Sequence, residues 1–215
     1  MRWLVFISLV FLLSCREILP VEPEEITDGY LIKGTITNQS GTPLENVDVK
    51  LFYETNWFSN APSDTNTAVV TDTGKIVAVE VVTLKNIVVK KLFYGKRPLG
   101  PIPTYLWDGY NDNGGLVAAG YYLIRYKLDT VVLKESPVVI DGTLIARTDY
   151  DGRFMIANES LPVGKIFDEY DDQDKYIRTL SIAQTVILEL YYGTVQKVGR
   201  VYLKKDVVTK VNIAM

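Results

Sequence analysis

The sequence contains no histidine and a single cysteine, Cys15. The absence of histidine excludes Ser–His and Cys–His nucleophile pairs and every zinc site that uses an imidazole ligand. A single cysteine also excludes a disulfide within the chain. The net charge of −3 disfavours a nucleic-acid partner, because such proteins present a basic face. We therefore expect a protein without a cofactor, without catalytic residues and without a nucleic-acid partner.

No apolar run is long enough to cross a membrane as a helix, which requires about 20 residues. The longest lies at the N-terminus, "WLVFISLVFLL" (3–13), with only Ser8 interrupting it. Arg2 precedes it and supplies a positive charge. This size and this flank are typical of a secretory signal peptide, which we assign to residues 1–14.

The end of that signal, Leu12-Leu13-Ser14-Cys15, resembles the bacterial lipobox. The resemblance implies that Cys15 is lipidated and becomes the first residue of the mature protein, which is then held to a membrane through this anchor. An unpaired cysteine in an exported protein otherwise lacks an explanation. The alternative is an ordinary secretory signal followed by a chance cysteine.

The next segment, "REILPVEPEEIT" (16–27), holds two prolines and four glutamates. Such a composition favours an extended polar tether, so 15–27 is interpreted as a lipidated tether. Arg16 occupies the position at which an aspartate marks inner-membrane retention in some bacteria. By that resemblance the outer membrane is the expected location.

Beyond residue 28 the apolar residues alternate with period two. In "NVDVKLFY" (46–53) and "GYYLIRYKLD" (120–129) one face is apolar and the other charged, and 185–192 and 210–215 repeat the pattern. Short alternating runs separated by Gly, Pro, Asn and Asp predict an all-β sandwich fold. The one helical candidate, 173–184, lacks a wide apolar stripe.

The segment "GTITNQSGTPLENVDVKLF" (34–52) resembles the opening of a carboxypeptidase regulatory-like domain, and "TDYDGRFMI" (148–156) resembles that family's next hairpin. The family's later elements match 161–164, 190–198 and 208–215. The resemblance implies a discontinuous, transthyretin-like (prealbumin-like) antiparallel sandwich made of 28–61 and 141–215. The family is named after a domain beside a zinc peptidase, but this chain has no zinc-ligand set, so only the accessory module is implied.

Between these pieces, residues 88–128 resemble the immunoglobulin-like (Ig-like) domain of the flagellar hook-capping protein FlgD. The matching positions are Trp107, Asp108, Gly109, Asp112, Gly114, Gly120 and Tyr122. We therefore expect a second small antiparallel β-sandwich at 62–140, inserted into a loop of the first, since exposed loops tolerate insertions.

The loop "WDGYNDNGG" (107–115) could be either a calcium site or a turn. A calcium loop of the EF-hand type needs oxygen ligands at alternate positions and a glutamate at the twelfth. Counted from Asp108, the third position is Tyr110 and the twelfth is Ala119. We therefore predict a turn, with Trp107 packed in the core and calcium binding as the alternative.

Acidic residues concentrate in "FDEYDDQDKY" (167–176). The favoured interpretation is a solvated loop of like charges. Divalent-metal binding is a weaker alternative, and carboxylate catalysis a weaker one still. The metal alternative would use Asp168, Asp171, Asp172 and Asp174.

Two adjacent aromatics, Trp57 and Phe58, stand beside the expected crossing between the two domains. We expect them to fill the seam there. The alternative is contact with a partner or a sugar, to which Tyr191 and Tyr192 could contribute. The sequence thus predicts a non-enzymatic, lipid-anchored envelope protein that serves in adhesion, spacing or assembly with an unknown envelope protein. A carbohydrate-binding surface lipoprotein is the alternative.

Overall fold

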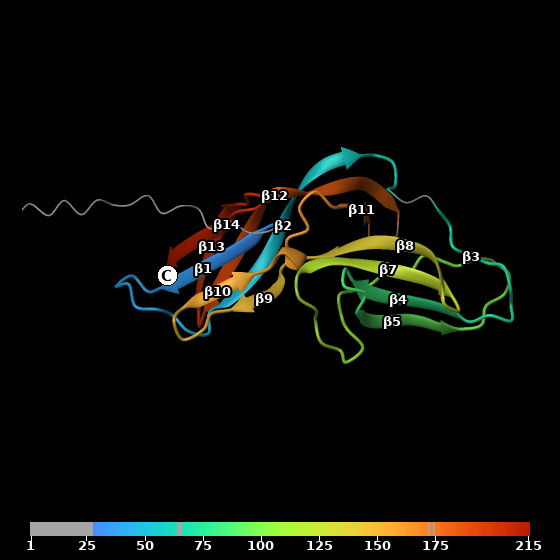
Figure 1. Ribbon diagram of the computed structural model, residues 1–215, viewed down its shortest axis with the longest axis horizontal. Coiled ribbons are helices and arrows are strands. Elements are labelled where there is room, and N and C mark those ends of the chain that lie inside the picture. The colour runs from blue at the N-terminus through green and yellow to red at the C-terminus, as the bar shows by residue number, and fades with distance from the viewer. Residues whose placement is uncertain (1–27, 64–65, 172, 174) are drawn as a thin grey trace, which may run out of the picture.

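The computed structural model describes residues 28–63, 66–171, 173 and 175–215. Cys15, the signal segment 1–14 and the tether 15–27 lie outside these residues. The described chain is nearly all β, as predicted (Figure 1). Its strands are β1 (Leu31–Thr37), β2 (Asp48–Ser59), β3 (Val69–Val70), β4 (Val77–Thr83), β5 (Val88–Gly95), β6 (Gly100–Pro101), β7 (Gly120–Leu128), β8 (Val131–Ile140), β9 (Thr143–Arg147), β10 (Arg153–Ile156), β11 (Ile166–Tyr170), β12 (Tyr176–Tyr192), β13 (Val195–Tyr202) and β14 (Val208–Ala214), with a 3-10 turn, η1 (Asn158–Ser160).

Two sheets pack face to face to form a sandwich, which we call the first region. One sheet has the order β10-β1-β14, and the other has the order β11-β12-β2-β9 with β13 also paired to β12. Alternate residues of β1 and β2 point into the shared core, which is the period-two pattern seen in the sequence. Its fully buried large side chains include Ile32, Ile36, Leu51, Ile156, Leu161, Ile182, Leu188, Leu190 and Leu203.

The pairing in the first region differs from the expectation in two places. β14 runs parallel to β1, with Leu31 opposite Val208, and the long chain between them provides the crossover that parallel pairing needs. The segment 148–156 is a corner rather than a hairpin, since β9 pairs with β2 whereas β10 pairs with β1. The helical alternative at 173–184 is wrong, because β12 covers residues 176–192 as one long strand.

The second region holds a four-stranded antiparallel sheet with the order β5-β4-β7-β8. The ribbon β3–β6 and the loop 102–118 cover one face of this sheet and enclose a second, separate core. Trp107 packs in that core as predicted; its ring meets that of Tyr122 edge-on at 5.0 Å. Its indole N–H donates to the carbonyl oxygen of Tyr110, 2.8 Å away, so the buried polar atom is satisfied.

β7 contributes to both cores. Tyr122, Ile124 and Tyr126 point into the second core, as the alternation predicts. Tyr121, on the opposite face, is buried in the core of the first region. A second contact across this junction is the ion pair between Lys85 Nζ and Glu159 Oε1, at 2.6 Å. The two regions therefore share a packed junction.

The pairing partners of β2 bear on the expected insertion. β2 pairs only with β9 and β12 in the described chain, so its neighbours come from 143–147 and 176–192. No registered partner of β2 lies in 67–128 among the described residues. Whether 62–140 folds alone remains a prediction. Within the described residues, no helix has the length and apolar character needed to cross a membrane.

Candidate functional site

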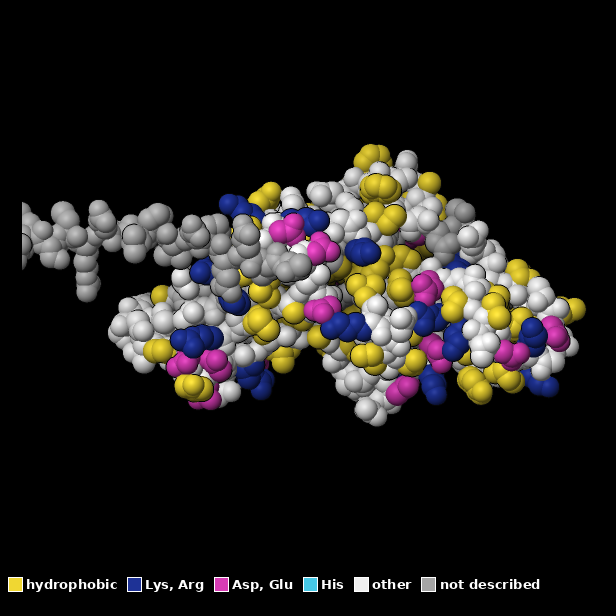
Figure 2. All heavy atoms as spheres, in the orientation of Figure 1, with side chains coloured by type: hydrophobic (Ala, Val, Ile, Leu, Met, Phe, Trp, Pro, Cys, Tyr) yellow, Lys and Arg dark blue, Asp and Glu magenta, His cyan; other side chains and the backbone are white. Residues whose placement is uncertain are grey.

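The distal end of β2 carries the most exposed pair of adjacent aromatics in the described chain. Trp57 is 66% exposed and Phe58 is 58% exposed. In Figure 2, hydrophobic side chains stand at the top of the molecule, over the end of β2. The expectation that these two residues fill the seam between domains is wrong. β2 extends past β9, which reaches only to Leu51, so no described strand pairs with its last residues on that edge.

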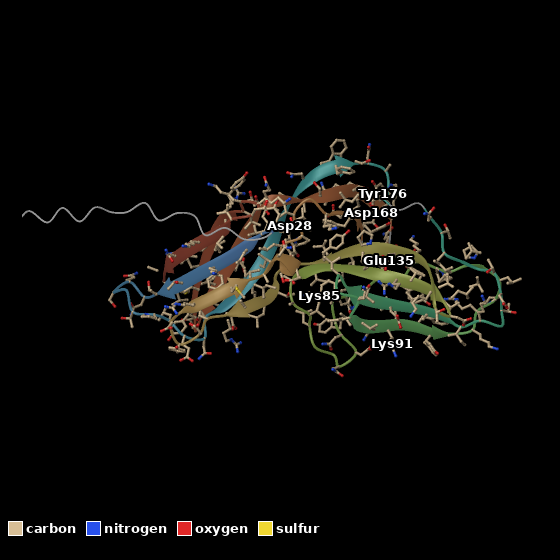
Figure 3. The ribbon with its side chains drawn as sticks, viewed as in Figure 1. Asp28, Lys85, Lys91, Glu135, Asp168 and Tyr176 are labelled. Atoms are coloured by element: carbon tan, nitrogen blue, oxygen red, sulfur yellow. The ribbon has the colours of Figure 1, made fainter. Side chains whose placement is uncertain are left out.

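The end of β2 that carries Trp57 and Phe58 is paired along one edge. β2 stays in register with β12 from Thr55 opposite Ile182 to Ser59 opposite Thr179, with a bulge beside Phe58. The Tyr176 hydroxyl lies 3.4 Å from the carbonyl oxygen of Ser59. Figure 3 labels Tyr176 on β12 near this end of β2, with Asp168 on β11 just below it. The aromatic pair therefore stands on a supported strand rather than on a free loop.

Close to this end of β2 lies a cleft between β8 and β11 of about 220 Å³. Its walls include four aromatic residues, Tyr105, Trp107 and Tyr126 from the second region and Tyr170 from β11, among aliphatic and polar side chains. The Tyr170 ring meets the Tyr176 ring at 6.1 Å, which connects the cleft to the base of the exposed pair. Aromatic walls with a few polar groups suit a small organic ligand such as a sugar ring.

Two of the acidic candidates, Asp168 and Asp171, make hydrogen bonds that support the fold. The Asp168 carboxylate accepts the backbone N–H of Ser63 at 2.9 Å and lies 2.6 Å from the hydroxyl of Thr179, which is fully buried. Asp171 Oδ1 accepts the backbone N–H groups of Gln173 and Lys175 and thereby closes a turn. These contacts explain both residues as turn and strand supports.

The other two acidic candidates, Asp172 and Asp174, lie outside the described residues. Among the residues that the structure describes, no group of three or more acidic, cysteine or histidine side chains is placed to hold a metal ion.

Tyr191 and Tyr192 lie at the other end of β12, where Tyr191 is opposite Asp48. About eleven strand residues separate Tyr191 from the partner of Trp57, which is roughly 35 Å of strand. The Tyr191 hydroxyl donates to Glu189 Oε2 at 2.7 Å, and Lys50 Nζ lies 4.7 Å from its ring centre. The four aromatic candidates therefore cannot form one small-ligand site.

The "WDGYNDNGG" loop is built as a turn, as predicted. Asn111 Oδ1 accepts the backbone N–H groups of Asn113 and Gly115, and Gly114 takes a positive φ of 76°. Asp112 Oδ1 accepts the backbone N–H of Lys91 at 3.2 Å and so ties the loop to β5. Asn111 Oδ1 and Asp112 Oδ1 are thus acceptors in the hydrogen bonds that build the turn and attach it to β5.

One surface was not found from the sequence. A groove of about 560 Å³ lies on the outer face of β10-β1-β14, lined by Lys33, Arg147, Arg153 and Lys210 with one acidic residue, Asp149. Lys33 and Lys210 stand opposite each other on neighbouring strands. These cations come from four separate segments, and only the strand pairing brings them together. Two of these cations, Arg147 and Arg153, form ion pairs with Asp48 and Asp151.

Burial changes the ionisation of two tyrosines at the junction. The pKa of Tyr121 is raised to about 12, first by burial and second by the nearby Asp168 carboxylate. The pKa of Tyr53 is raised above its usual range mainly by burial, and its hydroxyl donates to the carbonyl oxygen of Ser160 at 2.8 Å. Both groups stay neutral at physiological pH and act as hydrogen-bond donors in the structure.

The chain matches no protein-family model, no curated protein and no solved structure. The two domain resemblances therefore rest on their motifs alone.

Proposed function

We propose that the chain is a non-enzymatic, lipid-anchored envelope protein whose body serves in adhesion, spacing or assembly. The observation that carries this proposal is the exposure of Trp57 and Phe58 on the supported distal end of β2. Large exposed aromatics on a rigid element are the residues that most often anchor a protein contact. Here they project from a strand whose Val49, Leu51 and Tyr53 are buried in the core of the first region.

The anchor itself is proposed from the lipobox-like residues 12–15, with the outer membrane as the favoured location. Several acyl chains on Cys15 would hold the body stably, because each buried CH₂ contributes about 0.8 kcal/mol. The tether 15–27 would separate the membrane from Asp28, where the described body begins. The aromatic pair would then be free to contact a second envelope component.

Carbohydrate binding is the second candidate function, and the cleft between β8 and β11 favours it. Tyr105, Trp107 and Tyr170 supply ring surfaces there, in a cleft of about 220 Å³. Trp57 could extend such a site, because Tyr176 links the cleft to the end of β2. Tyr191 and Tyr192 stand too far away to take part.

The proposal can be tested by photo-crosslinking in intact envelopes, with a benzophenone amino acid placed at Trp57. The matched control places the same group at Tyr94, an aromatic on β5 that is 72% exposed. We expect a discrete crosslinked product from position 57 and none from position 94. Equal products from both positions, or none from either, would contradict the assignment of the β2 end as the contact surface.

The carbohydrate alternative makes a different prediction. Binding to envelope glycans would weaken at least tenfold with Tyr170→Ala, whereas Tyr192→Phe at the far end of β12 would leave it unchanged. A protein that binds no glycan at millimolar concentration, while the crosslink at Trp57 persists, would eliminate this alternative and leave the first proposal standing.

A further inference from the structure

The distal part of β2 has a free edge. β9 pairs with β2 only from Asp48 to Leu51, whereas β12 covers the opposite edge as far as Ser59. Beyond Tyr53, no described strand lies on the outer edge, and residues 55–58 are exposed. Figure 1 shows this end of β2 at the top of the molecule, with no other labelled strand above it.

The backbone groups on this edge can be assigned. The N–H of Ile182 donates to Lys165, and its carbonyl oxygen accepts from Gly164, so both point away from β2. Its partner Thr55 therefore faces the outer edge, because antiparallel pairs alternate between bonded and non-bonded. Trp57, two residues on, faces the same way. Thr55 and Trp57 thus present two N–H donors and two carbonyl acceptors to solvent.

The composition of this edge distinguishes it from the others. Proteins protect free edges with charges, proline or very short strands. Each other edge strand longer than two residues carries a charge, namely Lys90, Lys134, Arg147, Arg153, Asp168, Lys197 or Lys210 on β5, β8, β9, β10, β11, β13 and β14. The free edge of β2 begins with Glu54, whose carboxylate pairs with Arg200 on β13, and the rest of it, "TNWFS" (55–59), carries no charge. Its protection is limited to the bulge beside Phe58.

We propose that this edge pairs with the same edge of a second copy of the chain. Thr55 of each copy would lie opposite Trp57 of the other, with Asn56 on the two-fold axis. In this register the outward N–H and carbonyl groups of both residues are satisfied reciprocally, as an isologous contact requires. The inference rests on the proposed function, since it names the partner of the same surface.

A second copy fits this edge for two reasons. Segment 55–59 is uncharged, so pairing it with itself places no like charges opposite each other, a juxtaposition that destabilises sheets. In addition, Trp57 of each copy would lie diagonally across the joined strands from Trp57 of the other, within reach of an aromatic contact. A five-residue pairing is small beside a standard interface of about 1,600 Å². We therefore expect weak association in dilute solution and strong association when a shared membrane raises the effective concentration.

Disulfide trapping tests the register. In the proposed pair, Asn56 and its symmetry mate are a non-hydrogen-bonded pair with Cα atoms about 4.5 Å apart, which is within disulfide range. The full-length protein carrying Asn56→Cys should form a crosslinked dimer in intact envelopes under mild oxidation. The control is Val198→Cys on edge strand β13, where Val198 is 56% exposed. It should give at least tenfold less dimer.

Each trapping variant is also made with Cys15→Ser. A dimer trapped at position 56 with and without Cys15 supports self-pairing independently of the anchor. Retention of the Cys15→Ser variants in the membrane fraction would contradict only the anchor. A dimer no more abundant than in the Val198→Cys control overturns the inference. If the Trp57 photo-crosslink then captures a different protein, the proposed function survives without self-pairing.

A charge exchange provides the second test. Asn56→Lys and Asn56→Asp each place like charges on the two-fold axis. Either should reduce co-purification of two differently tagged copies by about tenfold or more. Co-expression of the Lys variant with the Asp variant should restore it. Circular dichroism would show whether both variants are folded. If both are folded and co-expression does not restore co-purification, pairing across Asn56 is contradicted.

Discussion

The hydroxyl of Tyr121 donates a hydrogen bond to the carbonyl oxygen of Ile166, 2.7 Å away, and so ties β7 of the second region to β11 of the first. Tyr121 is 9% exposed and packs in the core of the first region. Removing the hydroxyl would leave the Ile166 carbonyl without this partner at the junction.

We therefore predict that Tyr121→Phe lowers the free energy of unfolding by about 1–3 kcal/mol, the cost of leaving a buried acceptor unsatisfied. Urea unfolding monitored by fluorescence would measure the loss. Tyr150→Phe is the matched control, because Tyr150 is 77% exposed and should tolerate the change. Equal stability of the two variants would mean that the bond contributes nothing measurable.

The raised pKa of Tyr121 makes a prediction about alkaline stability. An unfolded tyrosine ionises near pH 10, whereas Tyr121 in the folded protein ionises near 12. The folded state thus holds its proton longer, so this contribution is fully present below pH 10 and is lost as the pH rises toward 12. Unfolding free energies measured from pH 8 to 11.5 should fall less steeply for Tyr121→Phe. A residual slope should remain, because burial also raises the pKa values of Tyr53 and Tyr122.

Gly152, at the corner between β9 and β10, should be intolerant of any side chain. Its φ is +69°, and an added Cβ would lie 2.3 Å from the carbonyl oxygen of Ile36. We expect Gly152→Ala to destabilise the protein by more than about 2 kcal/mol, because left-handed backbone alone costs about 1–2 kcal/mol. Gly164→Ala measures the cost of the left-handed backbone alone, because φ is +78° there and the space around the Cβ position is open. Similar thermal shifts for both variants would show that the corner can relax.

The proposed insertion predicts that 62–140 folds when expressed alone, and that the remainder folds when a short Gly-Ser linker replaces it. Loop closure depends only weakly on length. Because β7 contributes to both cores, the prediction also covers the stability of each fragment. Both fragments should be less stable than their counterparts in the whole chain, because Tyr121 would lose its burial. Dispersed NMR spectra of the two fragments would support the division, and an unfolded 62–140 would refute it.

The lipid anchor predicts that Cys15→Ser abolishes labelling by radioactive palmitate and releases the protein from the membrane fraction. The wild-type chain serves as the control. A variant that still sediments with membranes, beside a wild type that takes no label, would contradict the lipobox resemblance.

Alternation of apolar residues predicts strands at 46–53, 120–129, 185–192 and 210–215, which correspond to β2, β7, β12 and β14, and one buried face of β7. It could not reveal that Tyr121, on the other face, is buried too, because that burial comes from β11 and η1, which are distant in sequence. The position of Trp57 was misjudged for a related reason. Sequence places it beside a domain crossing, but only the pairing register shows that β2 extends beyond β9. The basic groove likewise exists only once β1 and β14 are paired.

The parallel pairing of β1 with β14 has a mechanical consequence for a protein held by its N-terminus. The chain enters the body at Gly29, whose N–H donates to Asp206 Oδ1 and whose carbonyl oxygen accepts the N–H of Asp206. β1 then lies between β10 and β14 and is bonded on both edges. A pull along the axis of β1 would load these ladders in shear, so many bonds would have to break together rather than one after another. The strand nearest the proposed anchor is therefore the one best placed to resist tension.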